Sequence, residues 1–96
     1  MNINDIVKKK RDEILQIAEK HGAYNIRVFG SVARGDAGSE SDIDFLVDVG
    51  HEHSSFFPGG FMADLEELLG CRIEILTENA LHWYIRDRVL KEAVPL

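Results

Sequence analysis

Cysteine is nearly absent from this chain, because the 96 residues contain only one, Cys71. A single cysteine cannot form an internal disulfide, so nothing indicates a secreted, disulfide-stabilised protein. No apolar run approaches the roughly 20 residues that span a bilayer, and residues 1–10 are too polar for a signal peptide. We therefore expect a cytoplasmic protein without a membrane segment, folded as one small domain over residues 1–96.

Basic residues are fewer than acidic ones: 11 Lys and Arg against 17 Asp and Glu leave a formal net charge of −6. Proteins that bind long nucleic acids usually carry the opposite charge, because phosphate contacts need Lys and Arg. A DNA or RNA substrate is therefore disfavoured. A chain this short also has no room for a second domain, so an enzyme of this size needs a partner, or the substrate itself, to complete its site.

Helical and alternating apolar patterns divide the chain into three helices and three strands. We expect helices at 4–21, 61–69 and 79–92, and strands at 25–29, 42–49 and 71–76. Asn4 and Thr77 are the expected caps of the first and last helices, and the segments 30–41 and 51–60 are expected loops. The last helix should bury Leu81, Tyr84, Ile85, Val89 and Leu90. This order predicts an α/β domain with a small mixed sheet of three or four strands packed with helices.

Two aspartates and one glutamate are candidates for a metal site. Asp42 and Asp44 lie two residues apart on an expected strand, so both carboxylates lie on one face of it. Ionised carboxylates this close repel each other, and Mg²⁺ favours a small set of carboxylates together with substrate phosphates. Glu74, on another expected strand, would add a third carboxylate if the two strands are neighbours. Taken singly, each acid is more simply explained as a solvated surface residue.

The segment Gly30-Ser31 ends one strand and begins an expected helical turn. Gly30 lets the backbone approach a ligand closely, and the N–H groups of the turn, with the Ser31 hydroxyl, suit a phosphate. Arg34 could hold a phosphate with its guanidinium fork; the alternative is an ordinary turn with a surface arginine. Asp42 follows Ser31 by eleven positions. The combination favours nucleotidyl transfer, which needs a triphosphate and a metal side by side.

Residues 30–35, Gly-Ser-Val-Ala-Arg-Gly, and 41–47, Ser-Asp-Ile-Asp-Phe-Leu-Val, resemble the signature of the nucleotidyltransferase superfamily that includes DNA polymerase β. The short chain and its ending at 92–96 resemble the minimal nucleotidyltransferases (MNT), which are commonly antitoxins of HEPN-domain toxins. The resemblance implies a polymerase β-like palm with Gly30 and Ser31 on the triphosphate, Asp42 and Asp44 on Mg²⁺, and Glu74 as the third acid. The family usually has aspartate at this last position.

The resemblance further implies transfer of AMP from ATP to a hydroxyl, namely a tyrosine of a HEPN toxin. Two alternatives stay open: an antitoxin that binds a nucleotide and neutralises its partner by contact alone, and an enzyme that modifies small molecules. The aromatic pair Phe56-Phe57 allows a contact surface, whereas the missing second domain argues against small molecules. His51 and His53 are expected to be solvated, because no further ligands complete a zinc set. Self-association and a separate protein partner both stay open.

Overall fold

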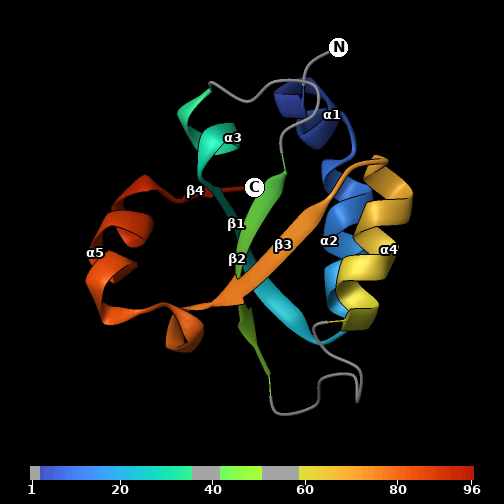
Figure 1. Cartoon of the computed structure of the whole chain (residues 1–96). Coiled ribbons are helices and arrows are strands. Elements are labelled where there is room, and N and C mark those ends of the chain that lie inside the picture. Colours follow the sequence, from blue (N-terminus) through green and yellow to red (C-terminus); the bar gives the residue numbers. More distant parts are fainter. Residues whose placement is uncertain (1–2, 36–41, 51–58) are drawn as a thin grey trace.

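One mixed sheet of four strands forms the centre of the protein (Figure 1). The computed structural model describes residues 3–35, 42–50 and 59–96. The strands are β1 (Ala23–Phe29), β2 (Ile43–Val49), β3 (Ile73–Thr77) and β4 (Val94–Pro95), in the order β3-β2-β1-β4. The central strand β2 runs antiparallel to β1 and parallel to β3, and β4 runs antiparallel to β1. The predicted α/β class and mixed sheet are confirmed.

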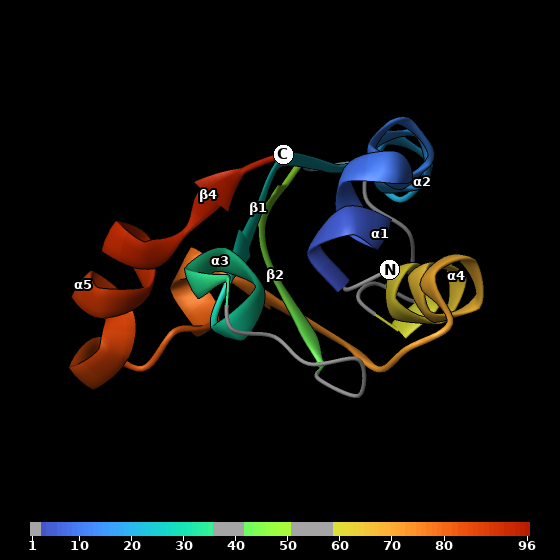
Figure 2. The ribbon, with the colours of Figure 1, turned by 90° about the horizontal axis from the view of Figure 1, so that it is seen from above.

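Helices pack on both faces of this sheet (Figure 2). The helices α1 (Ile3–Lys9), α2 (Arg11–Lys20) and α4 (Gly59–Leu69) lie on one face, α5 (Trp83–Glu92) lies on the other, and the single turn α3 (Ser31–Arg34) follows β1. The larger core contains Ile43, Phe45 and Val47 of β2. Leu46 instead joins a smaller cluster with residues of α5. Because side chains alternate along a strand, this division places Asp44 on the α5 face.

The first predicted helix, 4–21, is two helices in the structure. It is divided at Lys10, which lies between α1 and α2, and Asn4 lies inside α1 instead of capping it. The physical reason is the spacing of the apolar side chains. No apolar residue occurs between Val7 and Ile14, although both are buried. Nothing therefore holds the intervening turn against the core, and a change of helix direction there costs little.

The last helix begins later than predicted. A short 3₁₀ turn at Glu78–Ala80 precedes it, and the cap is His82, whose imidazole accepts a hydrogen bond from the Tyr84 N–H at 3.2 Å. The expected cap Thr77 precedes the 3₁₀ turn and makes no side-chain cap bond. Thr77 extends β3, since it pairs with Val47.

The first turn of α5 is exposed, contrary to the predicted apolar face. The exposed fractions are 81% for Trp83, 77% for Tyr84 and 39% for Ile85. Leu81 and Val89, by contrast, are buried. The helix therefore contacts the sheet through its second half. In the described ranges, no helix is long and apolar enough to cross a membrane. Phe56-Phe57, His51 and His53 lie outside the described residues.

Candidate functional site

A glycine turn joins β1 to α3 and contacts the acidic strand. Gly30 has φ 72° and ψ −147°, a backbone region that only glycine enters readily. A Cβ at this position would overlap Oδ2 of Asp44. The contact follows from the strand register, in which Phe29 pairs with Asp44. Ser31 and Arg34 are the first and last residues of α3, so the structure brings all three predicted phosphate-binding residues next to the acidic strand.

The predicted acids gather at the beginning of β2 and β3. Asp44 and Glu74 pair directly in the parallel register. Both face α5, because Leu46 and Leu76, two residues further along each strand, pack in the cluster on that side. Asp42 immediately precedes β2 and is exposed. The two strands thus bring together residues that lie thirty positions apart in the sequence, as the hypothesis of a third carboxylate required.

Partial burial and then the neighbouring acids raise the proton affinity of Asp44. Its pKa rises from 3.8 to about 6, first because the carboxyl is partly buried, then through a hydrogen bond with Glu74 and the charges of Glu74 and Asp42, with Arg34 opposing the rise. Among the described residues, no group of three or more His, Cys, Asp or Glu side chains is arranged as a ready metal site. Mg²⁺ is usually held by one or two carboxylates and substrate phosphates, so the Asp44–Glu74 pair fits this ion.

Glu92, at the end of α5, is a residue of the site that the sequence patterns did not single out. Its Oε2 accepts a hydrogen bond from the Gly30 N–H at 3.0 Å, and its Oε1 accepts one from Arg34 Nη1 at 2.7 Å. The Arg34 guanidinium, with help from the Gly30 N–H, lowers the pKa of Glu92 against the opposing effect of burial. The long-range pairing of β4 with β1 helps to bring Glu92 here, and a two-residue strand leaves no alternating pattern to detect.

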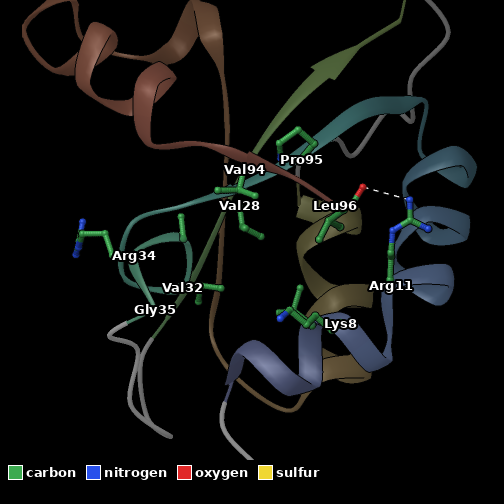
Figure 3. Close-up of a pocket in the computed structure, with 11 residues that line it drawn as sticks. Lys8, Arg11, Val28, Val32, Arg34, Gly35, Val94, Pro95 and Leu96 are labelled. Atoms are coloured by element: carbon green, nitrogen blue, oxygen red, sulfur yellow. Dashed lines mark hydrogen bonds between the residues drawn. The ribbon is translucent and has the colours of Figure 1, made fainter.

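A cavity of about 310 Å³ lies behind the turn, between α1, α3 and β4 (Figure 3). Its wall is largely apolar and includes Val28, Val32 and Leu96. Arg34 also borders it, but its guanidinium points away from the apolar lining (Figure 3). None of the three acids lines this cavity. The candidate site is therefore the open face in front of the turn, on the α5 side of the sheet.

Comparisons with known proteins agree with this geometry. The sequence model of the nucleotidyltransferase domain family matches residues 7–96. A protein of Methanocaldococcus jannaschii named "putative protein adenylyltransferase" is 42% identical over 94 residues, which cover 98% of this chain and 97% of that relative. The protein adenylyltransferase MntA of Thermococcus cleftensis is 37% identical over 79 residues, covering 82% of this chain and 80% of MntA.

Solved structures share the fold over most of the chain. A "putative minimal nucleotidyltransferase" superposes with a TM-score of 0.86 at 38% identity, covering 100% of this chain and 97% of that one. A chain of the toxin–antitoxin complex MntA–HpeT superposes with a TM-score of 0.61 at 23% identity, covering 100% of this chain and 72% of that one, which shows the fold alone. By the domain match and the closely similar relatives, this chain belongs to the nucleotidyltransferase domain family.

Proposed function

We propose that this chain is a magnesium-dependent adenylyltransferase that transfers AMP from ATP to a hydroxyl group of a protein. The observation that carries the proposal is the contact of the Gly30 turn with Asp44, with Glu74 beside it. A turn suited to phosphate and a carboxylate pair suited to Mg²⁺ are thereby adjacent, as the reaction requires. The two relatives named as protein adenylyltransferases support the same activity and a protein as acceptor.

In this mechanism the chain positions groups and balances charge. The turn at Gly30-Ser31 and the Arg34 guanidinium hold the β- and γ-phosphates. Mg²⁺ would be held by the Asp44–Glu74 pair and the phosphates of the nucleotide, with Asp42 as the further carboxylate, and it would neutralise phosphate oxygens and ease deprotonation of the acceptor hydroxyl. That hydroxyl attacks the α-phosphorus, the bond from this phosphorus to the bridging oxygen breaks, and pyrophosphate leaves. The hydroxyl proton passes to a carboxylate of the site, for which we assign Glu74, which is exposed beside the partly buried Asp44.

The acceptor in this proposal is a tyrosine of a HEPN-domain toxin in the cytoplasm, and its modification inactivates the toxin. The resemblance to MNT antitoxins supports this assignment, and so does the 37% identical relative named protein adenylyltransferase MntA. The exposed Trp83 and Tyr84 also support a protein partner, because aromatic side chains are enriched in protein interfaces.

Labelling with ATP tests the proposed function directly. We expect purified protein, Mg²⁺ and ATP radiolabelled in the α-phosphate to transfer label to the protein encoded beside its gene. The label should disappear with EDTA and with Asp44→Asn, and mass spectrometry should locate AMP on a tyrosine. A tight complex that carries no label would instead favour an antitoxin that acts by contact alone. Label on neither the neighbour nor any other protein would contradict the proposal.

Glu74 is expected to be required as a carboxylate, although the family usually has aspartate at its position. Glu74→Gln should lower transfer by about a hundredfold or more, because it removes a negative charge that would hold the metal, and the metal in turn would stabilise the negative charge of the transition state. Glu74→Asp should keep or raise the rate. The label-transfer rate under saturating ATP and Mg²⁺ measures both. Glu67→Gln removes an exposed charge on α4 and serves as the control. Equal rates for all variants would make Glu74 an ordinary surface residue.

A further inference from the structure

The carboxylate of Glu92 joins the two ends of the phosphate-binding turn. One oxygen accepts from the Gly30 N–H at 3.0 Å, and the other accepts from Arg34 Nη1 at 2.7 Å. The Glu92 side chain is 17% exposed, although the Arg34 side chain is 44% exposed. A long cation at the surface normally samples many rotamers. This one is instead tethered, by a charge-assisted bond, to a carboxylate that is largely buried.

The backbone fixes the place of Glu92 independently of this ion pair. Directly after Glu92 the chain enters β4, where Val94 pairs with Val28, two residues before Gly30. Val89, one turn before Glu92, is buried in the cluster that contains Phe29. The end of α5 is therefore attached to the end of β1 on both sides of Glu92. The backbone therefore sets the position of the carboxylate. The Gly30 turn and the Arg34 guanidinium are held by their hydrogen bonds to it.

We propose that Glu92 is a positioning residue for the nucleotide: it sets the Arg34 guanidinium and the Gly30 turn in the arrangement that receives the triphosphate. The inference rests on the proposed function. Glu92 binds the guanidinium through Nη1, one nitrogen of a group with five N–H donors. Glu92 therefore orients the Arg34 guanidinium, and the contact with the phosphate is made by Arg34 itself. Because the donors are ordered before ATP arrives, less side-chain freedom is lost on binding.

The expected effect appears in nucleotide affinity more than in turnover. Glu92→Gln keeps an oxygen that can accept from the Gly30 N–H but loses the ion pair with Arg34. We expect KM for ATP, and Kd for a non-hydrolysable ATP analogue with Mg²⁺, to rise about two- to tenfold, the range that corresponds to ordering one long side chain. We expect kcat to change less than about twofold. Asp87→Asn, which removes an exposed charge from the same helix, should leave both constants unchanged.

A double-mutant cycle with Arg34 separates positioning from a purely structural role. Arg34→Ala should raise KM by itself, and adding Glu92→Gln should then have little further effect, because this change keeps an acceptor for the Gly30 N–H and removes only the ion pair with Arg34. Thermal unfolding of every variant, with assays well below each midpoint, controls for stability. Additive effects on KM would overturn the proposal, as would an unchanged KM in Glu92→Gln. Tighter nucleotide binding by Glu92→Gln would also overturn it, since the carboxylate would then be a competitor of phosphate.

The same experiments distinguish an error in the role of Glu92 from an error in the proposed function. Label transfer that is equal in wild type and Glu92→Gln, with equal KM, removes the role of Glu92 and leaves the activity intact. Binding of the analogue without any label transfer removes the activity, while the Kd comparison still decides the role of Glu92. A wild-type protein that does not bind the analogue would overturn both.

Discussion

Replacement of Asp44 by asparagine is expected to abolish nucleotide transfer and, at the same time, to make the metal-free protein more stable at neutral pH. Transfer should fall at least about a hundredfold, because an amide cannot supply the charge that a metal ligand needs. Stability should rise because Asp44 is partly buried beside Glu74 and Asp42. Asparagine keeps the shape of the side chain and removes the repulsion. Asp42→Asn should likewise lose transfer without losing stability.

The stability difference should depend on pH with a definite sign. The pKa of Asp44 is raised from 3.8 to about 6 in the folded protein. As the pH rises from about 4 to 6, the unfolded chain releases this proton while the folded protein retains it. The contribution of Asp44 to the free energy of unfolding is therefore fully present below the unfolded-state pKa of 3.8, and it is lost as the pH rises through about 6. The asparagine of the variant does not titrate, so the gain in stability of Asp44→Asn should be largest above about pH 6 and vanish near pH 4.

Thermal unfolding in EDTA over this pH range measures the effect. Asp48→Asn is a matched control on the same strand, because Asp48 bonds to Arg27 at 3.1 Å and to Asn25 at 2.9 Å. Its replacement removes favourable contacts, so it should lower the melting temperature while leaving transfer intact. Added Mg²⁺ should raise the melting temperature of wild type at about pH 7.5 and not that of Asp44→Asn. A variant less stable than wild type at every pH would contradict the assigned repulsion.

The order of helices and strands could be predicted because burial leaves a periodic signal in the sequence. Ile43, Phe45 and Val47 alternate toward the main core, and the alternation also places Asp44 correctly on the opposite face. Helix breaks and caps depend on few residues, so they leave no such periodic signal. The break at Lys10 lies in a polar stretch without core contacts, and the cap at His82 depends on where one turn of α5 begins. The polar stretch permits a break between α1 and α2, but the exact position of the break, like that of the cap, is set by tertiary packing.

The candidate site divides in the same way. The neighbours Gly30 and Asp44 could be inferred because a short connection joins two strands that carry recognisable residues. To predict the pairing of Asp44 with Glu74, one must know the order of the strands in the sheet, and the residue patterns do not reveal that order. Glu92 lies in the ending that resembles the MNT proteins, but its place in the site could not be predicted, since it lies 62 residues from Gly30 and the short edge strand β4 follows it. A polar residue with a long-range partner has the same local pattern as one exposed to solvent.

Replacement of Gly30 by alanine is expected to destabilise the protein and to disrupt the site, and the effect should exceed that of replacing Gly70, which has the same sign of φ. The positive φ of Gly30, with ψ −147°, costs alanine about 1–3 kcal/mol. In addition, the new methyl group overlaps the Asp44 carboxylate, which must rotate out of the position where it faces Glu74. Transfer should therefore be lost even below the melting temperature of the variant.

Gly70 supplies a matched control for the backbone part of this effect. Gly70 also has a positive φ, 68°, but an added Cβ meets no atom within 4 Å. Gly70→Ala should cost only about 1–2 kcal/mol and leave transfer intact. In an Asp44→Ala background the overlap at Gly30 is gone, so the cost of Gly30→Ala in the free energy of unfolding should shrink to its backbone part. Urea denaturation of the four proteins of this cycle measures the coupling. An unchanged cost in that background would mean that the turn and the carboxylate are not in contact, which would remove the geometric basis of the proposed site.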